Sequence, residues 1–261
     1  MRACWAACLG NCSGNFSGEH IITEGVFLTD SVRVKGLPWC LEFKDIGLAN
    51  LVKNVLCRRH NSELSPADLG AIQLRDAICD TAGLSEGRKL MATGKSWPIE
   101  RFRVDGFAIE RWCLKTLITI AFGGQVPIGN GDLPGEPPRE LVETAFAMRE
   151  FQPPSAGLHW MGKAGDIINA SEGVVVTTFL DNARHLAGAR FWFWGLNLLL
   201  VLNDGATGPF SFVSLDGKQI IQPNTVYHPQ RLNVGVHNRP SHTLEFDWHV
   251  GMRTIPTGIS S

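Results

Sequence analysis

Hydrophobic periodicity in the middle of the chain predicts three helices. Residues 65–68, Ser-Pro-Ala-Asp, have the composition of a helix start, with a hydroxyl side chain at the N-cap, proline at the first helical position and a carboxylate in the first turn. We therefore predict a helix from Ser65 to about residue 81. Apolar residues at helical spacing predict a second helix over 109–122, and a third is predicted over 139–150 after a loop rich in glycine and proline.

Beyond Pro153-Pro154 the pattern changes to short apolar runs separated by turn residues such as Asn-Asp-Gly. Runs of this length and composition are typical of strands. We predict an antiparallel β-rich unit over 155–261. Its expected strands cover residues 173–180, 190–202, 210–215, 226–227, 232–236 and 244–249.

The first 61 residues are rich in Cys, Gly, Asn and Trp and have little helical periodicity before Asn50. This composition favours loops and hairpins. The whole chain is therefore predicted to be an α+β protein in three parts: a small N-terminal module over 1–65, a helical region over 66–154 and the β-rich domain over 155–261.

Composition limits the classes of function. The chain has 261 residues, 44% of them hydrophobic, which suffices for a buried core. Its 24 Lys and Arg balance 25 Asp and Glu, so it lacks the basic excess typical of nucleic-acid-binding proteins. The longest apolar run, residues 191–202, is too short to cross a bilayer. We expect a soluble, cytoplasmic protein with no membrane partner.

The seven cysteines indicate metal binding more than disulfides, because their number is odd and no convincing signal peptide precedes them. Cys57 and His60 have the spacing that lets a thiolate and an imidazole bind one zinc ion from a tight turn. Cys4 with Cys8 offers the second half of the site and is our preferred pair. Cys8 with Cys12 has the same spacing, and free thiols in a small core are the alternative.

Two further features accompany these cysteines. Glu19-His20 lies between the two halves of the predicted zinc site, and Asn61 follows directly after the second half. A carboxylate and a histidine at the end of a strand, followed by an amide on a helical turn, can place an oxygen-rich cation site beside an imidazole base. Such a pairing suits phosphodiester cleavage.

These residues carry a family resemblance. Residues 19–22, Glu-His-Ile-Ile, and residues 54–61, Asn-Val-Leu-Cys-Arg-Arg-His-Asn, resemble the His-Asn-His (HNH) endonuclease motif in its zinc-containing form. The match covers about a quarter of the 261 residues. It implies a ββα-metal fold, in which a two-stranded hairpin and a short helix hold one divalent ion and a zinc knuckle braces the hairpin. The remaining residues resemble regions of uncharacterised bacterial proteins, and this resemblance gives no information about their chemistry.

The resemblance also implies a role for each residue of the motif. His20 would be the general base, while Glu19 and Asn61 would hold a catalytic Mg²⁺ or Mn²⁺ ion. The middle asparagine, which orients the base, would be Asn54, with Asn50 as the alternative. Asn61 stands where histidine is more usual, and an amide is a weaker ligand. Structural zinc would be bound by Cys4, Cys8, Cys57 and His60.

Two functions are therefore expected. The first is a metal-dependent endonuclease that hydrolyses phosphodiester bonds of nucleic acid, with DNA favoured over RNA. The alternative is a non-catalytic, zinc-stabilised binding protein whose C-terminal β-rich domain recognises a ligand or partner, and the near-neutral charge and Asn61 favour it.

Overall fold

The protein is described by a computed structural model of mixed α and β structure, so the predicted α+β class is confirmed. The residues that it describes are 4–34, 40, 42, 44–90, 99–152, 156–163, 166–171, 173–202, 211–214, 219–221, 225–236 and 239–249. Among the described residues, no helix combines the length and the apolar composition needed to cross a membrane.

A hairpin followed by a short helix forms the N-terminal part. Strand β1 (Phe16–His20) pairs antiparallel with β4 (Val52–Cys57), and α1 (Arg58–Glu63) begins directly after β4. The register places Glu19 opposite Lys53 and His20 opposite Val52. Flanking and connecting elements are η1 (Ala7–Leu9), η2 (Glu24–Val26), β2 (Ser31–Val34), β3 (Lys44–Gly47) and η3 (Leu48–Leu51).

The three predicted helices are present with different ends. Helix α2 (Ser65–Leu90) continues past residue 81, because a glycine costs only about 1 kcal/mol in a helix and good helix formers follow it. Helix α3 (Gly106–Gly124) begins earlier than expected, where the Asp105 carboxylate accepts a hydrogen bond from the Ala108 backbone N–H at 2.9 Å. Helix α4 (Arg139–Ala145) is shorter than the predicted 139–150.

Helices α2 and α3 approach each other closely at Gly70. A Cβ added there would lie 2.5 Å from the Cβ of Ala108. We expect Gly70→Ala to lower the free energy of unfolding by about 1–3 kcal/mol, because the overpacking outweighs the better helix propensity of alanine. Urea denaturation measures the effect.

Gly83→Ala is the matched control in the same helix. Its added Cβ meets no atom of the described residues within 4 Å. We expect this variant to raise the free energy of unfolding by up to about 1 kcal/mol. Equal stability changes at the two glycines would contradict the close packing of α2 against α3.

Two larger sheets form the rest of the described chain. A seven-stranded antiparallel sheet has the order β12-β11-β8-β9-β10-β6-β13, and a four-stranded sheet has the order β5-β15-β14-β7. The strands of the first are β6 (Gly157–Met161), β8 (Val174–Leu180), β9 (Leu186–Phe193), β10 (Leu196–Val201), β11 (Ser211–Ser214), β12 (Gln219–Ile221) and β13 (Thr225–Tyr227). Those of the second are β5 (Glu100–Asp105), β7 (Ile167–Asn169), β14 (Arg231–Val236) and β15 (Arg239–Asp247).

The four-stranded sheet adds parallel pairing to the predicted antiparallel β-rich unit. Strand β5 comes from the predicted helical region and pairs in parallel with β15, and β7 pairs in parallel with β14. The predicted strand over 190–202 is instead a hairpin, which turns at Trp194 (φ 52°) and Gly195 (φ 90°). The turn was hidden because apolar residues flank it on both sides.

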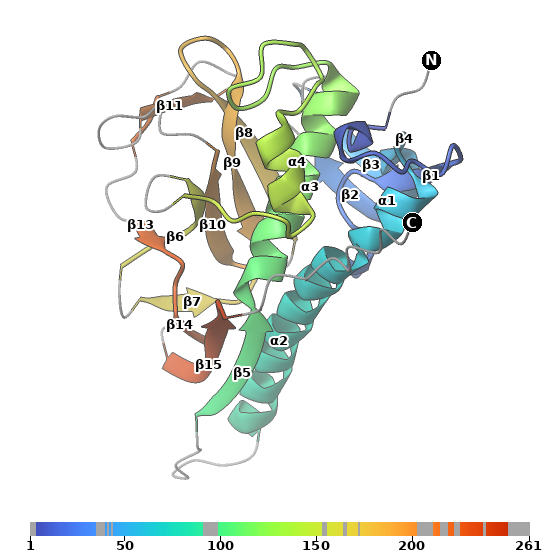
Figure 1. Ribbon diagram of the computed structural model, residues 1–261. Helices are drawn as coiled ribbons and strands as arrows, with labels where there is room; N and C mark the ends of the chain where they lie inside the picture. The colour runs from blue at the N-terminus through green and yellow to red at the C-terminus, as the bar shows by residue number, and fades with distance from the viewer. Residues whose placement is uncertain are drawn as a thin grey trace.

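Helix α3 is the centre of the molecule. Figure 1 shows it between α2 on one side and strands of the seven-stranded sheet on the other, with β1, β4 and α1 gathered at one end of α2. Buried side chains from Cys4 to Trp248 join one hydrophobic cluster. Residues of all three predicted parts therefore share a core, while the division into domains stays a prediction.

Candidate functional site

Four side chains at the end of the hairpin can hold a metal ion. The ligand atoms of Cys4, Cys12, Cys57 and His60 all lie within 4.8 Å of one another. His60 Nδ1 is 3.3 Å from the Sγ of Cys4, 3.8 Å from that of Cys12 and 3.4 Å from that of Cys57. Three sulfurs and one imidazole nitrogen at this spacing fit a tetrahedral site, and zinc is compatible with it.

The local fold explains how these ligands come together. Cys57 is the last residue of β4 and His60 lies in α1, so one strand-to-helix turn presents both. The backbone N–H of Cys57 donates to the Cys4 sulfur at 3.4 Å. After η1 the chain turns back at Gly10 (φ 77°) and Asn11 (φ 56°), and this reversal returns Cys12 to the cluster.

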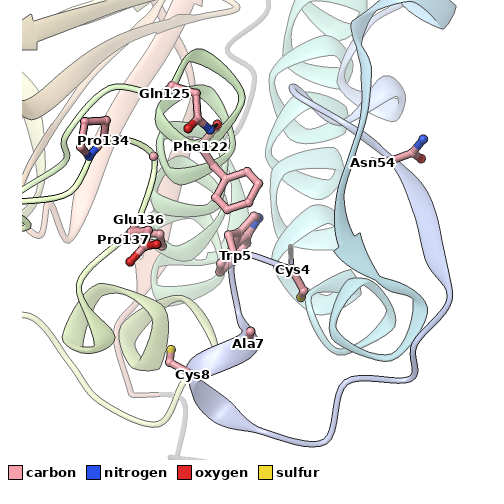
Figure 2. A pocket seen from close by; sticks show the side chains of 11 residues that line it. Cys4, Trp5, Ala7, Cys8, Asn54, Phe122, Gln125, Pro134, Glu136 and Pro137 are labelled. Atoms are coloured by element: carbon pink, nitrogen blue, oxygen red, sulfur yellow. Dashed lines mark hydrogen bonds between the residues drawn. The ribbon is translucent and has the colours of Figure 1, made fainter. Parts of the chain in front are cut away.

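The structure corrects one predicted ligand: Cys8 is not in the cluster, and Cys12 takes its place. Cys8 lies within η1, where its thiol is exposed and faces α4, close to Arg139 and Glu143. Figure 2 shows Cys8 apart from Cys4, although both residues line the cavity drawn there. The other predicted ligands, Cys4, Cys57 and His60, do lie together.

The pKa values of Cys57 and His60 favour metal binding, whereas that of Cys4 does not. Burial opposes ionisation of Cys57, but hydrogen bonds from the backbone of His60 and Ser13 lower the pKa of its thiol to about 7. Burial lowers the pKa of His60, which favours the neutral ring that a metal requires. Burial raises the pKa of Cys4 to about 12, so without a cation this thiol stays protonated. All seven cysteines are free thiols.

A small polar cavity on the hairpin brings together three of the predicted site residues. Its volume is about 250 Å³, and Glu19, His20 and Asn61 all line it. His20 is partly exposed, with Nε2 3.5 Å from a carboxylate oxygen of Glu24. The remaining lining residues are Gly18, Thr23, Glu24, Gly25, Ser62, Ser65 and Asp68. Carboxylate and amide oxygens beside an imidazole form the donor set that a hard cation prefers.

Behind this cavity lies an ion-pair network that the sequence did not reveal. The ammonium group of Lys115, on α3, contacts the Glu19 carboxylate and donates to both carboxylate oxygens of Asp68 at 2.7 Å. Burial raises the pKa of Glu19, and the positive charge of Lys115 opposes that rise. Thr23 donates to Asp68 and accepts from the indole N–H of Trp112 at 2.9 Å.

Asn54, the predicted middle asparagine, lies elsewhere. It is exposed on β4 and lines the larger cavity of about 540 Å³ together with Cys4, Trp5 and Phe122. Figure 2 shows it across that cavity from Gln125 and Pro134. The alternative, Asn50, is exposed in η3, whose Leu51 carbonyl accepts from the Ile21 N–H at 2.8 Å directly after His20. Within the described chain, neither asparagine lines the cavity around His20.

Comparison of the chain with models of protein families, with curated proteins and with solved structures finds no match in any of the three.

Proposed function

We propose that the protein is a metal-dependent endonuclease of the HNH type. The observation that carries the proposal is the common cavity of Glu19, His20 and Asn61, on a hairpin and helix whose ends meet at a Cys/His cluster. Glu19 and His20 end β1, whereas Asn61 lies about forty residues later on α1. An HNH motif requires these residues to converge in one cavity. A Glu-His dipeptide that occurs by chance would not be expected to meet Asn61 there.

His20 acts as the general base in this proposal. Its ring is partly exposed at the cavity, where an imidazole nitrogen can accept a proton from a water molecule. The carboxylate of Glu24, 3.5 Å from Nε2, helps to orient the ring and stabilises it once it is protonated. The oxygen of that water would form a bond to phosphorus while the P–O bond to the leaving sugar oxygen breaks. The leaving oxygen would take up a proton from solvent, and the protonated ring would release its proton to solvent.

Glu19 and Asn61 hold Mg²⁺ or Mn²⁺ in the same cavity. When bound, such an ion supplies positive charge to the scissile phosphate and the leaving oxygen. Glu19 is fixed for this task by its contact with Lys115, and Asn61 by its place on α1. Cys4, Cys12, Cys57 and His60 hold structural zinc, which ties the segment before β1 to the β4–α1 turn.

The test is cleavage by the full chain with and without an added divalent cation. We expect Mg²⁺ or Mn²⁺ to raise nicking of supercoiled plasmid by at least about 100-fold, because charge on the phosphate is otherwise not neutralised. Single-stranded DNA and RNA serve as parallel substrates, and we expect plasmid DNA to be cleaved fastest. A zinc-loaded protein that cleaves none of them with either cation would refute the proposal.

A non-catalytic zinc module is the second candidate. The contact between Glu19 and Lys115 favours it, because a carboxylate already neutralised by an ammonium group is a weaker cation ligand. In that case the motif serves as a scaffold and the β-rich part binds a ligand or partner. Manganese titration separates the two functions: the nuclease binds Mn²⁺ in the cavity of His20, whereas the scaffold binds zinc only.

A further inference from the structure

Lys115 is an unusual residue in its position on α3. Its side chain is 2% exposed, and its neighbours on the helix are almost all buried and apolar. A buried ammonium group is tolerated only when it is paired with acceptors. Lys115 pairs with Glu19 and Asp68, which come from β1 and from the first turn of α2.

Both partners also line the cavity of His20 and Asn61. Lys115 therefore lies behind the proposed cation site, on the far side of the carboxylates that face it. Two carboxylates and one ammonium group leave this site a net charge of −1. Glu24 adds a further carboxylate at the rim, but its side chain is 66% exposed, so solvent screens its charge.

We propose that Lys115 limits the affinity of the empty site for a divalent cation, so that tight cation binding requires the phosphodiester of the substrate. This inference rests on the proposed function. A divalent cation at a site of charge −1 leaves an excess of +1, which one phosphodiester of charge −1 neutralises. Lys115 is thus a positioning residue: it fixes Glu19 and sets the charge of the site without touching the substrate.

Asp68 has anchors other than Lys115. Thr23 donates to one of its carboxylate oxygens, and Trp112 in turn donates to Thr23. This chain of hydrogen bonds runs from Trp112 on α3 through Thr23 and holds Asp68 at the cavity without Lys115. Removal of the ammonium group therefore leaves Asp68 anchored, while Glu19 keeps its backbone position in β1 through the pairing with β4. The main expected change at the site is the loss of one positive charge.

The experiment is a titration of the full chain with Mn²⁺, in which electron paramagnetic resonance reports the free ion. We expect Lys115→Met to tighten Mn²⁺ binding by about tenfold or more, because one positive charge is removed within a few ångströms of the site. Asp68→Asn should weaken binding by a similar factor. The double variant restores the charge of −1 and should return to within a few-fold of the original affinity.

Two variants control for charge and for folding. Lys115→Arg keeps the charge and should bind Mn²⁺ like the original chain. Lys163→Met removes an exposed lysine that does not line the cavity and should change nothing. Circular dichroism checks that each variant is folded. If Lys115→Met does not fold, the comparison of the double variant with Asp68→Asn still tests the dependence on charge.

A dinucleotide with one phosphodiester tests the second half of the inference. It should tighten Mn²⁺ binding to the original chain more than to Lys115→Met, whose site already has the extra negative charge. Unchanged or weaker Mn²⁺ binding by Lys115→Met, with normal binding by the original chain, would overturn the inference alone. The absence of Mn²⁺ binding in every variant would refute the proposed function as well.

Discussion

Serine in place of Cys12 is expected to reduce the zinc bound per chain from one to well below one half and to unfold the N-terminal module. Cys12 supplies one of the four ligand atoms that lie within 4.8 Å of one another. Structural zinc sites of this kind contribute about 10–16 kcal/mol of binding free energy to folding at neutral pH. Elemental analysis of the purified protein measures the zinc, and thermal unfolding measures the stability.

Cys8→Ser is the matched control for this prediction. Cys8 is four residues away in sequence and is also exposed, but it lies outside the cluster. We expect this variant to keep its zinc and its melting temperature. If the Cys8 variant lost its zinc and the Cys12 variant kept it, Cys8 would be the ligand, as the preferred sequence pair predicts. That result would contradict the turn at Gly10 and Asn11.

Alanine in place of His20 should lower the rate of plasmid cleavage by about 10²–10⁴-fold, the usual contribution of a positioned general base. The side chain is partly exposed and makes an ionic contact with an exposed carboxylate, so its removal should cost little stability. Zinc content and thermal unfolding should therefore stay unchanged. Single-turnover cleavage in Mg²⁺ measures the effect.

His249→Ala provides the control for general loss of a histidine, because His249 is exposed and lines a different cavity. It should cleave at the original rate. Equal cleavage by the His20 variant and the original protein would show that another group removes the proton, and the assignment of the base would then be wrong.

The cluster of Cys4, Cys12, Cys57 and His60 shows how far sequence spacing predicts a metal site. Cys57 and His60 lie on one turn, so three residues of separation suffice to predict that they share an ion. The pairs Cys4–Cys8 and Cys8–Cys12 have the same spacing, so spacing does not decide which cysteines join Cys57 and His60. That choice depends on the path of the chain after η1. That path is set by left-handed backbone at Gly10 and Asn11. The Gly-Asn pair at positions 10 and 11 is the signal that favours a reversal there.

The sequence does not predict the ion-pair network of Lys115, Glu19 and Asp68, for a different reason. Asp68 is an acidic residue in the first turn of α2, where a carboxylate is favourable. This local role accounts for the residue and gives no reason to expect a distant partner. Lys115 fits the helical pattern of α3 without any sign that it is buried. Their contact joins residues 47 positions apart, so it depends on how α2 packs on α3 and not on either helix alone.

The same distinction holds for the fold. Long periodic segments predicted the helices and most of the strands, because local spacing encodes which side chains can share a buried face. The parallel pairing of β5 with β15 joins segments more than a hundred residues apart, and no local pattern encodes it. The sequence predicts one strand where the structure has the hairpin at Trp194 and Gly195, because both strands of the hairpin are largely buried and apolar.

Because Lys115 reaches the hairpin from α3, the first 65 residues do not carry their own electrostatic balance. A fragment limited to the zinc cluster, the hairpin and α1 would keep Glu19 and lose its cationic partner. Transplanting that fragment into another protein would therefore transfer the motif without the positive charge that pairs with Glu19. In evolutionary terms, the hairpin and the helix behind it are expected to be inherited together.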